Sequence, residues 1–317
     1  MAFILNLENP FQELELQTEI LFQMETGYMA APGFFQNGNI NHRWGAQQVI
    51  RMLMETSGLV HDPFVPFLAL NFYDRFISRF VILRPWFFSL FAICCTTLAW
   101  KTRRNDFSVQ ELLAASQPRI TYVGGLETVV QARHIEEMEF AILSVLNWRT
   151  RPITPVCFMN FFMSLLGIDD PQQRQALKEQ VFEHQILYMH RDIRFTRFRP
   201  SIIAVVGIMA EREEDRQDDF WNPVRVCDFV NLEEMENCLN LLEMARAEEI
   251  AAAAVVPQNA PPPPAPQNAA AAVVPQNAPP PQVPQNAAAA VVPQNAEPPQ
   301  VPQNDDPLQP RTPPQQE

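Results

Sequence analysis

The run from Trp86 to Lys101 is apolar on every side of the helix that it would form. A helix of this kind lies in the middle of a protein or in a bilayer, because it has no polar face to offer to water. A bilayer helix needs about 20 apolar residues. This run is shorter, and it is bounded by Arg84 on one side and by Arg103 and Arg104 on the other. We therefore predict that it is the central helix of an all-helical bundle.

Helical periodicity predicts four more helices around it within residues 41–150. Apolar residues recur three and four positions apart after His42, after Pro63, after Ser108 and before Leu146. Ser108 stands three residues before Glu111, a spacing at which the two side chains cap the start of a helix. No segment in this part of the chain shows a convincing strand pattern.

The helix after Pro63 illustrates how periodicity sorts side chains. Its apolar stripe leaves Asp74 and Arg75 aside, so both are expected to lie off the buried face. The stripe consists of Leu68, Phe72, Tyr73, Phe76 and Ile77.

Two prolines after Trp148, Pro152 and Pro155, cannot continue a helix and mark a domain junction. A second helical series follows. Its signals are the apolar segment 155–166, a long amphipathic helix with Leu177, Val181 and Tyr188 on one face, an apolar run after Arg199, and a last helix from its cap Asn231 to about Arg246. We predict an N-terminal segment (1–40, helical or partly disordered) and two tandem five-helix domains (41–150 and 151–250).

The composition changes abruptly after Ile250, where residues 251–268, 269–286 and 287–304 repeat with a strict period. The repeat unit has almost no large apolar residue to bury, and its prolines forbid regular helix. We therefore predict that residues 251–317 are a disordered tail with polyproline II character. Its PxxP spacings suit an aromatic groove on a partner, but a simple spacer is the favoured interpretation of the repeat.

The formal net charge of −13 argues against a nucleic-acid partner, because proteins that bind the phosphate backbone usually present a basic face. Two cysteines lie inside the apolar run and none forms a CxxC pair, which favours reduced thiols over a disulfide or zinc site. The five are Cys94, Cys95, Cys157, Cys227 and Cys238. The N-terminus shows no signal-peptide pattern.

Sequence motifs give no support for an enzyme. The chain lacks a Gly-rich phosphate loop, HExxH and G-x-S-x-G, and its histidines are scattered. We expect no catalytic residue, no metal site, no cofactor and no membrane partner.

Four stretches in order resemble the cyclin box, and specifically the box of plant D-type cyclins. The resemblance covers about residues 40 to 245. The stretches are LALNFYDRFIS (Leu68–Ser78), SLFAICCTTLAWK (Ser89–Lys101), EEMEFAILSVLNWRTRPITPVCFMNFF (Glu136–Phe162) and FTRFRPSIIAVVGIMA (Phe195–Ala210).

Five recurrent positions of that family are present. The resemblance implies that Arg43 and Asp74 form a structural salt bridge, and that Leu90 is a core leucine. It also implies that Lys101 and Glu139 contact a cyclin-dependent kinase around its mobile regulatory helix. Without the resemblance, Lys101 is a cation at a helix C-terminus, where it complements the helix dipole. Arg43, Asp74 and Glu139 are then ordinary charged residues at the surface.

Three departures from the family pattern concern partners. Arg103 and Arg104 stand where two acidic residues usually follow the lysine. The substrate-docking motif Met-Arg-x-x-Leu reads His42-Arg43-Trp44-Gly45-Ala46, and the tryptophan expected after it is Val49. The retinoblastoma-binding LxCxE motif has its nearest counterpart in residues 14–19, which lack the cysteine, so that contact is left open.

The resemblance implies a regulatory subunit that binds and activates a cyclin-dependent serine/threonine kinase of the cell cycle at G1/S, in nucleus and cytoplasm. Two alternatives stay open. One is a degenerate cyclin-box protein that folds but acts as a non-activating interaction module, which the charges of Arg103 and Arg104 favour. The other is a transcription-factor-like scaffold, against which the acidic charge argues.

Overall fold

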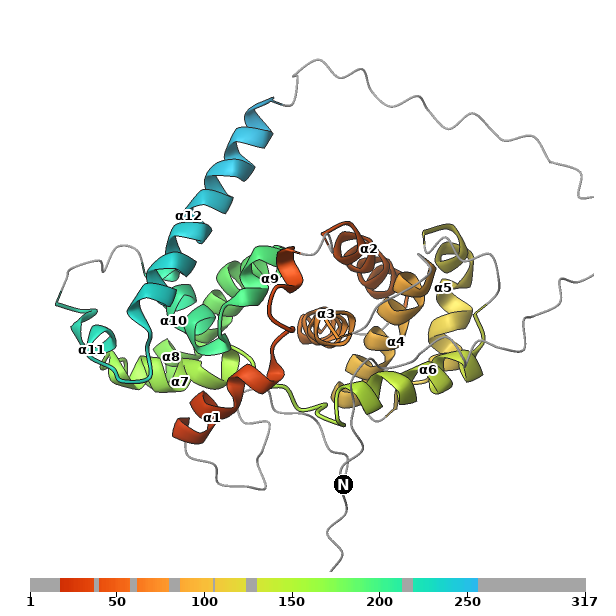
Figure 1. Ribbon diagram of the computed structural model, residues 1–317, viewed down its shortest axis with the longest axis horizontal. Helices are drawn as coiled ribbons and strands as arrows, with labels where there is room; N and C mark the ends of the chain where they lie inside the picture. The colour runs from red at the N-terminus through yellow and green to blue at the C-terminus, as the bar shows by residue number, and fades with distance from the viewer. Residues whose placement is uncertain are drawn as a thin grey trace, which may run out of the picture. The chain divides into compact units, whose positions relative to one another are not determined.

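The computed structural model describes residues 18–36, 40–57, 62–79, 86–104, 106–123, 130–212 and 219–255. All regular structure in these ranges is helical, as the sequence predicts (Figure 1). The chain divides into two units, Met1–Ala260 and Pro261–Glu317, and every described residue belongs to the first. The predicted disordered tail lies outside the described residues beyond Val255.

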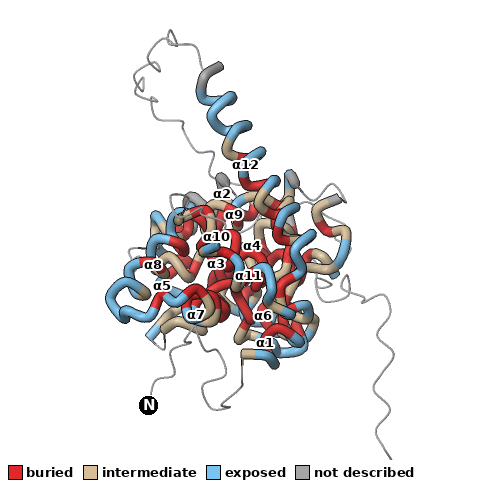
Figure 2. The backbone as a smooth tube through the Cα atoms, turned by 90° about the vertical axis from the view of Figure 1, so that its left-hand side faces the viewer, coloured by how far each residue is buried: buried red, intermediate tan, exposed pale blue. Residues whose placement is uncertain are grey.

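The apolar run forms α4, the buried helix of the first series. Helix α4 contacts α2, α3 and α6, and every residue from 91 to 100 is buried (Figure 2). This confirms its predicted central place. Among the described helices none is long and apolar enough to cross a membrane. The series consists of α2 (Ile40–Thr56), α3 (Phe64–Ile77), α4 (Trp86–Arg103), α5 (Val109–Val123) and α6 (Ala132–Val145).

The second series packs around α10, which is buried from Pro200 to Ile208 and contacts α7 and α12. The predicted long amphipathic helix is present as α8, a π-helical turn η3 and α9, which follow one another without a break. The elements are α7 (Val156–Leu165), α8 (Pro171–Gln180), η3 (Val181–Ile186), α9 (Leu187–Arg191), η4 (Ile193–Arg197), α10 (Pro200–Glu211), α11 (Asn222–Arg225) and α12 (Leu232–Val255).

Side-chain caps fix two helix starts where the sequence predicts them. The backbone N–H of Glu111 donates to Ser108 Oγ at 3.3 Å, and that of Glu234 donates to Asn231 Oδ1 at 3.0 Å. The end of α12 was predicted near Arg246 but lies at Val255. The residues beyond Arg246 are mostly Ala and Glu, which are strong helix formers and extend the helix without needing a buried face.

The N-terminal segment crosses to the second series. It comprises α1 (Thr18–Met24) and two 3-10 turns, η1 (Glu25–Tyr28) and η2 (Phe34–Gln36). The Phe22 ring lies 4.7 Å from the rings of both Phe158 and Phe229, measured between centroids. The segment that precedes the first series is thus packed into the core of the second.

Candidate functional site

Lys101 and Glu139 form an ion pair between the end of α4 and the middle of α6. Lys101 Nζ lies 2.6 Å from Glu139 Oε2. The glutamate side chain is only 7% exposed, whereas the lysine side chain is 38% exposed. The two residues that the sequence assigns to a partner contact therefore meet at the edge of the core, with the ammonium group reaching water.

Thr97 holds the second oxygen of the same carboxylate. Its Oγ1 donates to Glu139 Oε1 at 2.6 Å, from a buried position one turn before Lys101 on α4. Because both carboxylate oxygens are engaged, the Glu139 side chain has a fixed orientation. The pair is therefore already positioned before any partner arrives.

The two arginines that follow Lys101 are each paired with a carboxylate. Arg103 Nε lies 2.9 Å from Asp62 Oδ2, and Arg104 Nη2 lies 2.7 Å from Asp106 Oδ2. The positive charge that the sequence places beside Lys101 is thus compensated within the protein. This arrangement weakens the reason for expecting repulsion of a partner at this face.

Two exposed aromatic side chains lie on α6 and just beyond its end, in the part of the chain that follows Glu139. Phe140 and Trp148 are 62% and 59% exposed, and their ring centroids lie 5.8 Å apart in an edge-to-face arrangement. Trp148 has a φ of 58°, a left-handed conformation that is rare for a bulky residue. Exposed apolar groups bordered by charged residues are typical of interaction surfaces.

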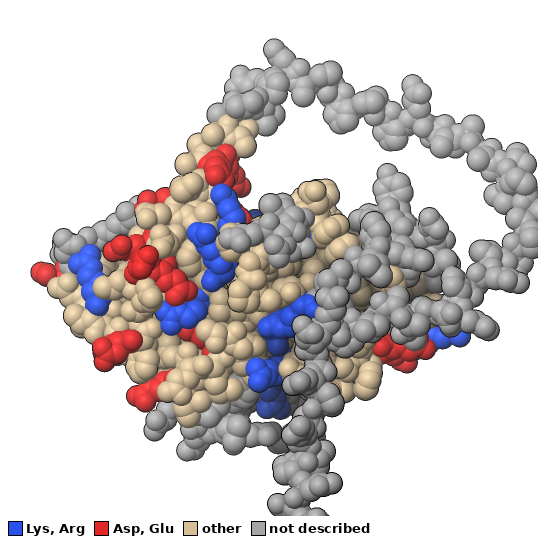
Figure 3. Space-filling model, viewed as in Figure 1, with Lys and Arg blue, Asp and Glu red and all other residues tan. Residues whose placement is uncertain are grey.

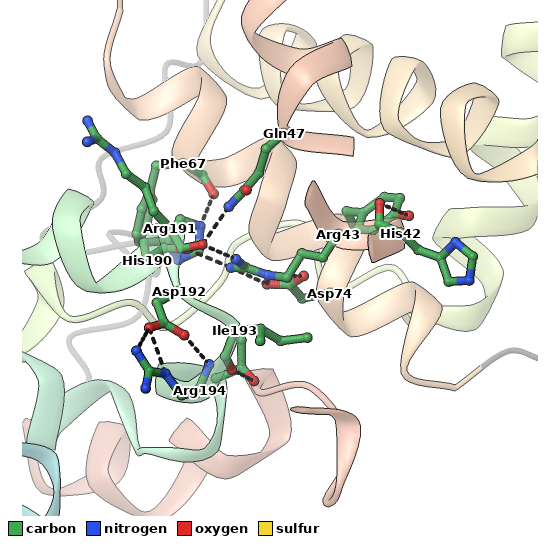
Figure 4. Close-up of polar contacts among 12 residues, drawn as sticks. His42, Arg43, Gln47, Phe67, Asp74, His190, Arg191, Asp192, Ile193 and Arg194 are labelled. Carbon is green, nitrogen blue, oxygen red and sulfur yellow. Dashed lines mark hydrogen bonds and ion pairs between the residues drawn. The ribbon is translucent and has the colours of Figure 1, made fainter. Parts of the chain in front are cut away.

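Arg43 and Asp74 form a buried ion pair between α2 and α3 (Figure 4). Arg43 Nε lies 2.9 Å from Asp74 Oδ1, and Nη2 donates to Oδ2 at 3.0 Å. The same guanidinium donates to two backbone carbonyls of α9, those of Arg191 at 2.7 Å and His190 at 2.6 Å. The pair therefore connects the first helical series to the second.

The helical periodicity of α3 led to a wrong prediction of burial for two of its side chains. Asp74 and Arg75 were expected off the buried face, but they are 4% and 2% exposed. The reason is that α3 is covered on more than one side, by α2 and α4 of the first series and by the polar contacts to α9. Burial raises the pKa of Asp74, and the neighbouring Arg43 opposes that rise.

The remaining family positions are also located by the structure. Leu90 is buried in α4. In the segment that corresponds to the docking motif, Ala46 and Val49 are buried, whereas Trp44 is 63% exposed. The His42 ring stacks on Phe88 with 3.7 Å between centroids. Only one large apolar side chain of this segment is thus available to a partner.

Sequence reasoning missed two titratable groups, one in the core and one at its edge. The Glu25 carboxylate accepts hydrogen bonds from the backbone N–H and the Oγ of Ser201, both at 2.8 Å. The half-buried His190 ring packs against Phe67, with Nε2 3.1 Å from the Phe67 carbonyl oxygen. Burial lowers the pKa of His190 to about 3. Both contacts join residues far apart in the chain, and no local pattern signals them.

The described ranges contain no group of three or more His, Cys, Asp or Glu residues placed to hold a metal ion.

Residues 16–151 match the family model of the cyclin N-terminal domain.

Plant proteins are among the curated relatives. Cyclin-D6-1 of Arabidopsis thaliana is 31% identical over 204 residues, which cover 62% of this chain and 64% of the relative. Cyclin-D6-1 of Oryza sativa is 31% identical over 194 residues, covering 58% and 57%. Cyclin-D2-2 of Oryza sativa is 26% identical over 235 residues, covering 73% and 62%. The chain spans less than two thirds of the length of these relatives.

The helical fold and the match of residues 16–151 to the cyclin N-terminal domain make this chain similar to the cyclin family. Within that family it resembles the plant D-type cyclins. This confirms the resemblance drawn from the sequence motifs.

Proposed function

We propose that the protein is a regulatory subunit that binds and activates a cyclin-dependent serine/threonine kinase, and so regulates the cell cycle at G1/S. The Lys101–Glu139 pair carries this proposal. It is preorganised by Thr97, it is partly open to solvent, and its Glu139 directly precedes the exposed Phe140 in α6, which contacts the exposed Trp148.

The chemistry of the face suits a partner helix or loop. The Lys101 ammonium has three N–H groups and donates one of them to Glu139. Its other N–H groups can donate to a backbone carbonyl of the kinase. Phe140 and Trp148 supply the apolar area that an interface core needs. The charged pair would fix the register, because an unpaired charge is costly to bury.

Activation follows from differential binding. A kinase that interconverts between inactive and active conformations shifts toward the active one if the cyclin face binds that conformation more tightly. A shift from about 1% to about 99% active requires about 10⁴-fold tighter binding of the active state. The protein itself carries out no chemical step. We further propose that it acts in the nucleus and cytoplasm, with a retinoblastoma-related protein left open as a partner.

The second candidate function is a cyclin-box module that binds without activating. Arg103 and Arg104 motivate this alternative, because they reverse the charge usual at these positions. Their pairing with Asp62 and Asp106 favours the activating reading, since the face carries less uncompensated positive charge than the sequence alone indicates.

A binding assay with a panel of purified plant cyclin-dependent kinases tests the proposal. Wild type is compared with Lys101→Glu, Glu139→Ala and the exposed control Arg51→Gln, each checked for helix content by circular dichroism. We expect wild type and the control to retain a kinase and the folded Lys101→Glu variant to lose it. Equal retention by Lys101→Glu would remove the assigned face, and loss in the control alone would point to another surface.

A further inference from the structure

Two arginines lie over the Tyr28 ring, and a third, Arg79, donates from Nη2 to the carbonyl of the next residue, Met29, at 3.0 Å. The Arg75 and Arg149 guanidinium carbons lie 5.3 and 5.6 Å from the centre of the Tyr28 ring. Arg79 follows one turn after Arg75 and donates to its backbone carbonyl. Arg79 and Arg149 are exposed, whereas Arg75 is only 2% exposed.

None of these three guanidinium groups has a carboxylate partner in the described part of the chain. Several other arginines there do, among them Arg43, Arg51, Arg103, Arg104, Arg174, Arg194 and Arg199. On the face drawn in Figure 3, basic side chains also lie along the middle of a protein that is acidic overall. These three neighbouring arginines therefore carry positive charge that no described carboxylate compensates.

Arg75 is incompletely satisfied as well as buried. Its Nη2 donates to the carbonyl of Arg149 at 3.1 Å, but Nε and Nη1 have no hydrogen-bond partner. Such groups are costly to leave unpaired. Burial, and then the nearby Arg79, lower the pKa of Arg75 to about 10, and Arg79 has its pKa lowered by burial and by Arg149. An anion would relieve both the repulsion and the unmet donors.

A cavity of about 80 Å³ adjoins the cluster and is lined by Tyr28, Asn71 and Arg75. The other charged groups in its wall are paired, Asp74 with Arg43 and Asp192 with Arg194, and His190 is neutral above its lowered pKa of about 3. Arg75 is thus the cation of this wall that lacks an opposite charge. The Oδ1 atom of Asn71, one turn earlier on α3, also has no partner and could accept the P–OH of a singly protonated phosphate.

We propose that Arg75, Arg79 and Arg149 form a binding site for a phosphate group, supplied either as the free ion or as a phosphorylated side chain of a partner. Guanidinium groups match phosphate oxygens through paired N–H donors, and such charge-assisted bonds are stronger than neutral ones. The site joins the N-terminal segment through Tyr28, helix α3, and the connection between the two helical series through Arg149. Phosphate binding would therefore hold these three segments together.

Calorimetric titration of the full chain tests the site at constant ionic strength, with chloride as the balancing anion. One arm uses inorganic phosphate, and the second uses a short phosphothreonine peptide beside its unphosphorylated form. The test variant is Arg79→Gln with Arg149→Gln, because both side chains are exposed and their loss leaves the core intact. Arg51→Gln is the matched control on α2.

We expect wild type and Arg51→Gln to bind phosphate or the phosphopeptide, and the double variant to bind at least about tenfold more weakly. Arg75→Lys, which keeps the charge but loses the paired donors, should also weaken binding if it folds. Tighter binding of the phosphopeptide than of phosphate would assign the ligand to a phosphorylated partner, and binding of the ion alone would assign it to free phosphate. Equal affinity of wild type and double variant, or no binding in either arm, would overturn the proposal.

Discussion

Arg43 holds the Asp74 carboxylate with two of its nitrogens and donates from the same guanidinium to the backbone carbonyls of His190 and Arg191. One side chain thus donates hydrogen bonds to a buried carboxylate in the first helical series and to two backbone carbonyls in the second. The family resemblance implies the pairing with Asp74. The link to α9 adds that the pair also fixes how the two series meet.

Removing one partner of this ion pair should destabilise the protein strongly. Asp74→Ala leaves the Arg43 charge buried and unpaired, so we expect a loss of about 3–5 kcal/mol in the free energy of unfolding. Replacing both members, as in Arg43→Met with Asp74→Leu, should cost less because no charge is stranded. Urea unfolding measures all three proteins. A loss below about 1 kcal/mol for Asp74→Ala would contradict the buried pair.

Stability should depend on pH through His190. In the unfolded chain this histidine takes up a proton near pH 6.5, whereas its pKa in the folded protein is about 3. Between these values the unfolded state binds more protons. The contribution of His190 is therefore complete above pH 6.5 and falls as the pH drops toward 3, by up to about 1.4 kcal/mol per pH unit.

The effect of this histidine is isolated by comparing wild type with the variant His190→Gln. The free energy of unfolding of both proteins is measured by urea unfolding from about pH 7 to about pH 4. The variant should lose stability less steeply than wild type as the pH falls. Parallel curves for the two proteins would show that His190 is not protonated on unfolding in this range.

Glu25 should tolerate neutralisation better than deletion. Its carboxylate accepts two hydrogen bonds from Ser201 at the start of α10, while burial raises the pKa of Glu25. Glu25→Gln keeps an acceptor and removes a buried charge, whereas Glu25→Ala leaves the Ser201 donors unmet and should cost about 1–3 kcal/mol. Thermal unfolding of both variants is the measurement. Arg199 Nη1 lies 3.8 Å from Glu25 Oε1, so equal losses would mean that the negative charge of Glu25, attracted to Arg199, holds this contact.

Trp148 should matter for binding and not for folding. It is exposed and left-handed at the backbone, so Trp148→Gly removes aromatic area and also relieves about 1 kcal/mol of backbone strain. We expect unchanged or slightly higher stability and at least tenfold weaker kinase binding, a loss of about 1.4 kcal/mol in binding free energy. Unfolding and surface binding assays on the same preparation separate the two effects. A variant that is destabilised but binds normally would give Trp148 a structural role.

Much of the helical framework could be predicted from local sequence. The run around Cys94 is apolar on every side, which requires burial, and Ser108 and Asn231 carry the cap chemistry that places helix starts. The end of α12 could not be placed, because its last turns lack an apolar face and depend on propensity alone.

The candidate site also has a part that could be predicted from the sequence and a part that could not. Lys101 and Glu139 could be named from motifs, but their 2.6 Å contact and the support from Thr97 are tertiary facts. Periodicity alone could not place Asp74 and Arg75 in the core, because it assigns charged residues to the outside; the pairing of Asp74 with Arg43 was implied only by the family resemblance.

Kinase activity of the reconstituted complex tests the central claim most directly. Phosphate transfer to a histone or retinoblastoma-type substrate is measured for a kinase that binds wild type, and then for the charge-exchanged variant Lys101→Glu with Glu139→Lys, which can keep an internal ion pair and serves as a folded control. We predict activation by wild type and none by the exchanged variant. A kinase that binds wild type without gaining activity would contradict activation and favour the non-activating module, and equal activation by both proteins would show that the pair does not face the kinase.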